Sequence, residues 1–126
     1  MAQPETAEPQ TFACDRPTED REKVMNMLCL SDLLEADIQL VREGGANNLH
    51  YHTGQDGFFL VLDGSARFYD ENEAVIAELD EREGILIPHG FRYWFEKAGE
   101  EPAEILHVAG VSDALDDERI EVADGE

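Results

Sequence analysis

The sequence predicts an all-β protein built as a sandwich or barrel. Short apolar stretches recur at roughly 8–12-residue intervals, separated by Gly, Pro, Asn and Asp residues that favour turns. No stretch of convincing length places apolar residues at the 3.6-residue period of a helix. About eight short strands with this spacing are typical of two packed sheets or a closed barrel.

The expected strands follow one another between turn residues. Residues 24–30 (VMNMLCL) fit either a strand or a buried turn of helix, and periodicity leaves both open. From Ala36 onward apolar and polar residues alternate up to the Gly44-Gly45 turn, which indicates a strand. Pro88 cannot donate a hydrogen bond to a neighbouring strand and marks a strand end. The remaining strands are expected over residues 50–52, 57–63, 65–70, 74–79, 85–87, 91–95 and 105–108.

Both ends of the chain are expected to be tails around one domain. Residues 1–22 contain three prolines among polar residues and almost nothing apolar, which predicts a mobile tail. Residues 111–126 carry 7 acidic residues and one arginine. An edge strand over residues 119–122 is an alternative there, but composition favours a disordered acidic tail. The barrel itself is therefore expected over residues 23–110, one domain by size.

The charge of the chain is strongly negative. Thirty acidic residues face nine basic ones, for a net charge of −21, and residues 33–110 alone hold 16 acidic and 5 basic residues, a net −11. Such a surface repels phosphate backbones, which excludes nucleic acid as a partner. An acidic, lysine-poor composition resembles proteins of high-salt cytoplasms, so we expect a halophilic protein, with an acidic mesophilic protein as the alternative.

No stretch of the sequence fits a membrane segment or an export signal. The longest apolar runs are a few residues, far below the roughly 20 that a spanning helix needs. The start of the chain, MAQPETAEPQ, has neither the basic nor the apolar part of a signal peptide. We therefore expect a cytoplasmic protein without a membrane partner.

Two histidines one residue apart form the main candidate site. In a strand, residues i and i+2 project to the same side, so the imidazoles of His50 and His52 can reach one metal ion. By itself such a pair is also common on surfaces or in hydrogen bonds. The spacing of the surrounding glycines therefore decides how strongly the pair indicates a metal site.

The spacing around this pair resembles the cupin family. Gly44, five residues, His50-x-His52 and then Gly64 twelve residues later match the first cupin motif. The sequence Pro88-His89-Gly90 resembles the second motif, and the resemblance covers roughly residues 36–109. It implies a jelly-roll barrel, the double-stranded β-helix, and a divalent metal ion as cofactor.

The resemblance is incomplete at two ligand positions. The family's glutamate falls on Gly57 and its third histidine on Tyr93. Asp56, a hard oxygen ligand next to Gly57, is one candidate for the third ligand, and Gln55 is a weaker one. His107 is the other candidate, although a lone histidine on an apolar strand is more often a core residue. With this weakened set, we expect partial metal occupancy that a chelator removes easily.

Aromatic residues near the histidines suggest a pocket for a small organic ligand. Tyr93 is a good hydrogen-bond donor to an anion or carbonyl, and Phe91 and Phe95 share its face. Phe59 belongs to the same expected pocket, where it also fills the core. If they face the cavity, Arg67 or Arg42 could neutralise a substrate carboxylate.

These features predict a small metal-binding cupin with a small-molecule ligand. As an enzyme it would resemble the metal-dependent dioxygenases, isomerases or decarboxylases of that family. A metal-free binding module is the alternative, as is an accessory barrel in a carbohydrate or secondary-metabolite pathway. We also expect a homodimer that pairs through residues 24–30, because small barrels leave an edge strand to cover.

Overall fold

The regular structure of this protein consists of β-strands. The computed structural model describes residues 8–110 and 117–122, and no helix occurs in these ranges. The strands are β1 (Lys23–Leu30), β2 (Leu34–Val41), β3 (His50–His52), β4 (Gly57–Asp63), β5 (Ser65–Asp70), β6 (Val75–Leu79), β7 (Gly84–Ile87), β8 (Tyr93–Ala98), β9 (Ala103–Gly110) and β10 (Arg119–Glu121). The all-β prediction is confirmed.

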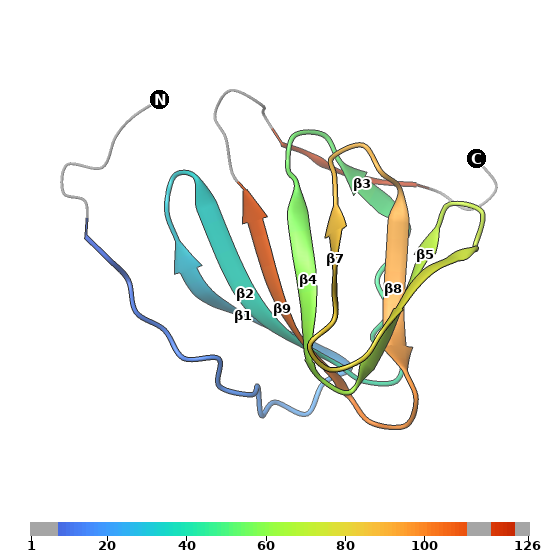
Figure 1. Ribbon diagram of the computed structural model, residues 1–126, viewed down its shortest axis with the longest axis horizontal. Helices are drawn as coiled ribbons and strands as arrows, with labels where there is room; N and C mark the ends of the chain where they lie inside the picture. The colour runs from blue at the N-terminus through green and yellow to red at the C-terminus, as the bar shows by residue number, and fades with distance from the viewer. Residues whose placement is uncertain (1–7, 111–116, 123–126) are drawn as a thin grey trace.

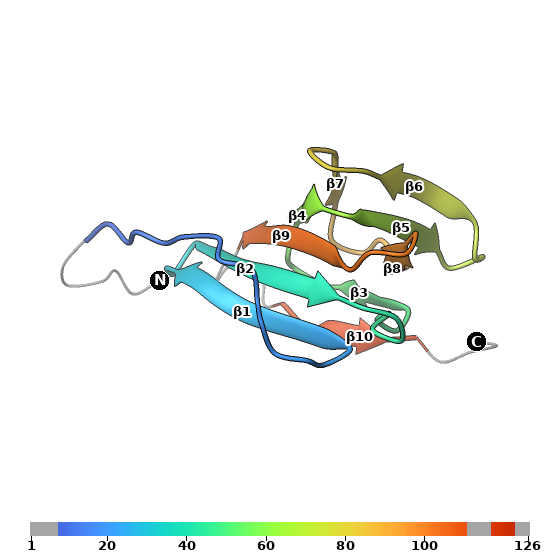
Figure 2. The same ribbon diagram turned by 90° about the horizontal axis from the view of Figure 1, so that it is seen from below.

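The strands form two five-stranded antiparallel sheets (Figure 1). The first sheet has the order β1-β2-β9-β4-β7, and the second has the order β10-β3-β8-β5-β6. From β2 to β10 the chain changes sheet at every step except between β5 and β6, so each sheet is built from alternate strands. Seen at right angles, the two sheets lie face to face with β1 and β10 at the same side (Figure 2).

The turn at Gly64 explains why two strands have the predicted limits. Gly64 has a φ of +78°, and an added Cβ would lie 2.3 Å from the carbonyl oxygen of Pro102. Only glycine fits such a turn, because a side chain would meet both the backbone strain and the steric clash. β4 therefore ends at Asp63 and β5 begins at Ser65, as the sequence predicts.

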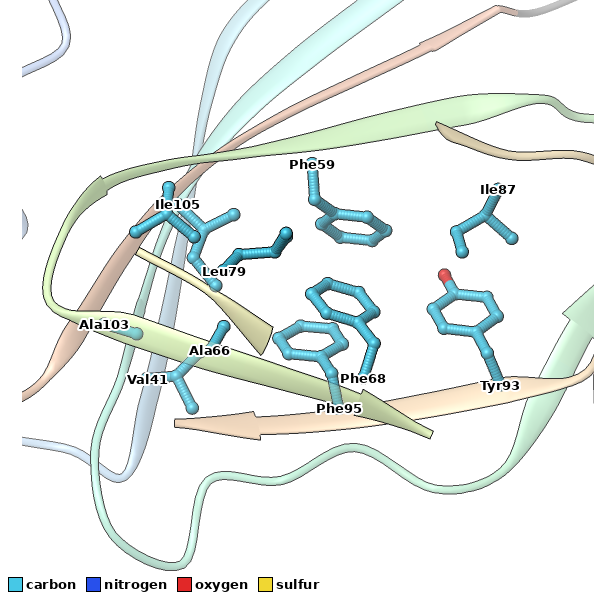
Figure 3. Close-up of a cluster of buried hydrophobic side chains, with 11 residues drawn as sticks. Val41, Phe59, Ala66, Phe68, Leu79, Ile87, Tyr93, Phe95, Ala103 and Ile105 are labelled. Atoms are coloured by element: carbon cyan, nitrogen blue, oxygen red, sulfur yellow. The ribbon is translucent and has the colours of Figure 1, made fainter. Parts of the chain in front are cut away.

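An aromatic core joins the two sheets (Figure 3). The ring centroid of Phe59 in β4 lies 5.2 Å from that of Phe68 in β5 and 5.2 Å from that of Phe95 in β8. Phe68 and Phe95 are completely or almost completely buried. Because the three rings come from both sheets, burial of their apolar surface holds the barrel closed.

The structure decides between the two alternatives for residues 24–30 and corrects the start of one predicted strand. Residues 24–30 form a strand, β1, rather than a turn of helix. The strand predicted over residues 91–95 begins later, at Tyr93, and runs to Ala98. Phe91 lies in the preceding turn, where its amide donates to the carbonyl oxygen of Pro88 at 3.3 Å.

Part of the expected acidic tail belongs to the second sheet. β10 pairs antiparallel with β3, with Arg119 opposite His52 and Glu121 opposite His50. The edge strand, considered above as the alternative, is thus the observed structure there. The other residues of the expected tail, 111–116 and 123–126, lie outside the described residues.

The segment over residues 8–22 has no regular structure but makes specific contacts. The side chain of Gln10 bonds to the backbone of Leu30 in both directions, and Arg16 forms an ion pair of 2.7 Å with Asp63. Pro17 is buried, and Figures 1 and 2 show this segment running along the β1–β2 side of the first sheet. Residues 1–7 of the expected tail lie outside the described residues.

Candidate metal and ligand site

A cavity of about 230 Å³ opens between the sheets at the side of β1 and β10. Strands of both sheets contribute to its wall. The residues that line it are Lys23, Met25, Glu35, Asp37, Gln39, Asn47, His50, His52, Gln55, Phe59, Tyr93, Phe95, His107, Asp117 and Arg119.

His50 is the most deeply buried of the candidate ligands. It is 3% exposed and lies opposite Tyr93 of β8, with 4.6 Å between the two ring centroids. Its Nδ1 lies 2.7 Å from the carbonyl oxygen of Asn48. Burial lowers the pKa of the His50 imidazole to about 4, so the ring is neutral at pH 7.

His52 projects to the same side of β3. Its ring centroid lies 5.4 Å from that of His50. Its Nδ1 lies 3.0 Å from one carboxylate oxygen of Asp117. The other oxygen of Asp117 accepts a hydrogen bond of 3.0 Å from the backbone amide of Gly54. The segment that leads into β10 therefore orients His52.

His107 enters the cavity from the first sheet. In β9 it lies between Asp37 of β2 and Phe59 of β4. Its Nδ1 is 3.0 Å from Asp37 Oδ2, and its ring stacks on Phe59 with 4.4 Å between centroids. An added Cβ on Gly57 would lie 3.1 Å from Nε2 of His107, so this nitrogen points to the space that glycine leaves.

All three imidazoles share one hydrogen-bonding pattern. A carbonyl or carboxylate oxygen can only accept a hydrogen bond, so Nδ1 of each ring carries the proton. Within the part of the chain that the structure describes, Nε2 of none of the three rings forms a hydrogen bond. In the neutral form of each ring the lone pair is therefore on Nε2, the atom through which an anchored histidine binds a metal.

The side chains are not gathered as tightly as a filled metal site requires. Among residues 8–110 and 117–122, no three His, Cys, Asp or Glu side chains are grouped closely enough to hold a metal ion. The donor atoms suit a metal, whereas their spacing here does not.

Asp56 does not lie with the histidines. Its carboxylate accepts hydrogen bonds from the backbone amide and Nδ1 of His89, at 2.8 and 2.7 Å, and its side chain is 56% exposed. These bonds lower the pKa of Asp56 and hold it at the turn after β7. Gln55, the weaker candidate, does line the cavity, where its Nε2 donates to Glu35 at 3.1 Å.

The predicted pocket residues divide into two groups. Tyr93, Phe59 and Phe95 line the cavity, and Figure 3 shows the Tyr93 hydroxyl on the side of Phe59 and Ile87. Burial raises the pKa of Tyr93, so its phenol stays protonated and can donate.

The other three predicted residues lie away from the cavity. Phe91, in the turn before β8, is 36% exposed. Arg67 pairs with Glu78 at 2.7 Å on the outside of the second sheet. Arg42 donates to the carbonyl oxygens of Glu19 and Arg21.

Sequence reasoning missed the polar and charged residues that line the cavity beside the histidines. Asp37 and Gln39 come from β2, Lys23 from β1, and Asp117 and Arg119 from the segment around β10. One signal was available in β2, where Glu35, Asp37 and Gln39 alternate with apolar residues that are themselves deeply buried. A strand buried on both faces with a polar row on one of them indicates a polar cavity.

The described residues include no helix that is long and apolar enough to cross a membrane.

Comparison with known proteins agrees with the fold. The family model described as "Cupin domain" matches residues 37–109. No curated protein matches the sequence. A conserved protein with a double-stranded β-helix domain from Klebsiella pneumoniae has a TM-score of 0.73 at 18% identity, over 91% of this chain and 100% of that one.

Two further solved structures are similar. KdgF from Halomonas sp. has a TM-score of 0.69 at 14% identity, over 82% of this chain and 94% of that one. A cupin-like protein from Thermotoga maritima has a TM-score of 0.65 at 13% identity, over 80% of this chain and 76% of that one. These likenesses confirm the double-stranded β-helix fold and, with the family match over more than half of the chain, show that this chain belongs to the cupin domain family.

Proposed function

We propose that this cupin binds a divalent metal ion through Nε2 of His50, His52 and His107 and holds a small organic ligand in the same cavity. One observation carries the proposal. Each of the three rings is anchored through Nδ1 to an oxygen acceptor, which leaves three Nε2 atoms around one cavity for a metal to bind. Carboxylate and carbonyl partners of this kind orient metal-binding histidines in proteins.

The donor set fits a transition metal, but the rings must move to bind it. Imidazole nitrogens suit zinc, copper, iron and nickel. Since no three donors are grouped closely enough in the described residues, binding has to draw the rings together. The free energy of that rearrangement weakens binding, which supports the expectation of partial occupancy and easy removal by a chelator.

When bound, such an ion would supply a Lewis acid that polarises a carbonyl or carboxylate of the ligand. The protein's own side chains would orient the ligand and limit the access of water to it. Phe59 stacks on the His107 ring and fixes its plane, while the protonated Tyr93 hydroxyl can donate to an oxygen of the ligand. The aromatic rings of Phe59, Tyr93 and Phe95 keep water from this part of the wall.

A metal-free binding module is the second candidate, and the spacing of the side chains favours it. In this case the same imidazoles only accept hydrogen bonds from the ligand through Nε2. The two candidates differ in whether a metal is retained.

The deciding experiment is metal analysis and titration of protein purified without an affinity tag. We expect the parent to bind Zn²⁺ or Co²⁺ at pH 7.5, and both the double variant His50→Ala/His52→Ala and His107→Ala to lose this binding. Asp56→Asn is the matched control and should bind like the parent, because Asp56 is bonded to His89 instead. Equal binding by the parent and the double variant, or no binding by the parent, would leave the metal-free module as the function.

We also propose that β1 pairs with a second copy of the chain. β1 is one of the two edge strands of the first sheet. Its Met25, Met27 and Leu30 side chains are 56%, 57% and 52% exposed, although all three are apolar. An exposed apolar edge strand is a surface that a homodimer covers.

A further inference from the structure

Two cationic side chains line the cavity together with the three histidines. Lys23 belongs to β1, an edge strand of the first sheet, and Arg119 to β10, an edge strand of the second. Only nine Lys and Arg residues occur in the chain against thirty Asp and Glu, and Lys23 is one of just two lysines. The lining also holds Glu35, Asp37 and Asp117, so the place where a negatively charged group of a ligand would bind is the space beside the two cations.

Lys23 has no counter-ion within the described part of the chain. Its ammonium group lies 5.2 Å from the centre of the Phe95 ring, and no ion pair involves it. Burial, and then the charge of Arg119, lower the pKa of Lys23, with Asp37 opposing them as a weaker effect. An anion between Lys23 and Arg119 would relieve both the desolvation and the repulsion.

The carboxylates of the cavity wall already have partners. Glu35 accepts from Gln55, and Asp117 accepts from His52 and Gly54. Asp37 accepts from His107 through one oxygen and from Gln39 through the other. These acids therefore orient neighbouring side chains, and none of them pairs with Lys23.

Gln39 presents a buried acceptor to the cavity. The residue is 4% exposed, and its Nε2 donates to Asp37 Oδ1 at 2.9 Å, which fixes the orientation of the amide. Its Oε1 is buried without a hydrogen-bond partner. An unsatisfied buried acceptor costs about 1–3 kcal/mol, so a donor from a bound molecule would stabilise the site.

We infer that the organic ligand is a small hydroxycarboxylate, with its carboxylate between Lys23 and Arg119 and a hydroxyl group that donates to Oε1 of Gln39. This inference rests on the proposed function of the cavity and adds the class of ligand. The cavity of about 230 Å³ is below the usual range of roughly 300–1,000 Å³ for ligand pockets, which limits the ligand to a small molecule. Arg119 reaches Glu121 through one Nη atom at 3.3 Å and keeps other N–H groups for the carboxylate.

Three probes of similar size separate the two features of the ligand. Lactate carries the carboxylate and the hydroxyl, propanoate only the carboxylate, and lactamide only the hydroxyl. Each is titrated into the full chain, with and without Zn²⁺, and binding is followed by the shifts of backbone amide signals in NMR spectra. We expect lactate to bind most tightly, propanoate less tightly, and lactamide at least about tenfold more weakly than lactate, as the loss of a charge-assisted hydrogen bond predicts.

Variants assign each feature to its residue. Lys23→Gln and Arg119→Gln should each raise the Kd of lactate about tenfold or more, and Gln39→Leu should remove the difference between lactate and propanoate. Lys97→Gln and Arg67→Gln are the matched controls. Both remove a cation outside the cavity, at the ion pairs with Glu43 and Glu78, and should leave the Kd unchanged.

The inference is overturned if lactamide binds as tightly as lactate, if no probe shifts the cavity signals at concentrations up to about 50 mM, or if the control variants weaken binding as much as the cavity variants. Zn²⁺ binding by the same proteins keeps the two proposals apart. Lactate binding without Zn²⁺ binding would remove only the metal proposal. Zn²⁺ binding without discrimination between lactate and lactamide would remove only the hydroxycarboxylate.

Discussion

Nε2 of His107 lies 3.1 Å from the position that a Cβ on Gly57 would occupy. The cupin resemblance places a glutamate ligand at residue 57, and here the imidazole of His107, from the neighbouring strand β9 of the same sheet, reaches the same space. The absence of a side chain at Gly57 therefore leaves the space that the His107 ring of β9 occupies. In the proposed metal site, the pair would replace the family's carboxylate ligand with a third nitrogen donor.

We predict that Gly57→Ala weakens metal binding and lowers the free energy of unfolding by about 1–3 kcal/mol, the usual cost of overpacking. The added methyl group would press on Nε2 of His107 and on the Val108 carbonyl oxygen, 3.2 Å away. Metal titration and urea unfolding measure both effects. Gly110→Ala is the control, because its Cβ would have no neighbour nearer than 3.9 Å. If Gly57→Ala binds metal like the parent, His107 is not a ligand.

We predict that Asp37→Asn lowers metal affinity by about 10–100-fold, the effect found for partners of metal-binding histidines. Asp37 accepts two hydrogen bonds, from His107 and from Gln39. An asparagine has one acceptor oxygen, so its NH₂ group would face one of these donors and misorient it. Calorimetric metal titration tests this, with Asp63→Asn on the exposed Arg16 pair as the control. Equal loss in both variants would point to a general charge effect.

We predict that His50 makes the metal-free protein less stable in acid. Its pKa is 6.5 in the unfolded chain and about 4 in the folded protein, so the unfolded state binds the proton first as pH falls. The stability contributed by neutral His50 is complete above pH 6.5 and is lost between pH 6.5 and 4. The shift corresponds to on the order of 3 kcal/mol.

The measurement for His50 is urea unfolding at pH 7.5 and pH 4.5 with a chelator present, for the parent and for His50→Gln. The variant keeps an N–H donor for the Asn48 carbonyl but does not titrate. The difference in stability between the two pH values should be larger in the parent. Equal differences would show that other groups cause the acid sensitivity.

We predict that stability rises with salt. Residues 33–110 carry a net charge of −11, from 16 acidic and 5 basic residues, and their mutual repulsion weakens as the screening length falls from about 10 Å at 0.1 M to about 3 Å at 1 M salt. The thermal midpoint should therefore increase between about 0.1 and 2 M KCl. A constant midpoint would argue against a halophilic protein.

We predict a dimer in solution that depends on β1. Light scattering at tens of micromolar protein and high salt should give twice the chain mass. Met25→Glu/Met27→Glu should shift this to the monomer mass, because the two exposed side chains would then repel their copies. Val75→Glu, at an exposed apolar residue of β6, is the control. A monomer mass for the parent would contradict the proposal.

Local signals in the sequence were sufficient for most of the barrel. The end of β4 and the start of β5 follow from one turn at Gly64, and the end of β7 follows from Pro88. The start of β8 could not be predicted, because apolar Phe91 looks like a strand residue while the Gly90 amide is bonded to the carbonyl oxygen of His52. That contact joins residues far apart in the sequence.

The site was less predictable than the fold for the same reason. His50 and His52 are neighbours, so their shared face follows from strand geometry alone. Asp56 was a reasonable third ligand by distance in sequence, but its bonds to His89 depend on how β4 and β7 pair. The contribution of β10 was hidden by its acidic composition, since Asp117 and Arg119 gain their roles only when the strand pairs with β3.

Two of the strands that line the cavity, β3 and β10, form few residue pairs in the described part of the chain. β3 is joined to β8 by a single residue pair, His50 with Tyr93, and β10 is joined to β3 by three pairs. Amide hydrogens of these two strands should therefore exchange with solvent faster than those of β2 and β9, which pair along eight residues. A ligand that contacts Lys23 of β1 and Arg119 of β10 would bind only while both strands are in place. Its binding should therefore oppose local opening of β10 and β3 and slow the exchange of their amide hydrogens.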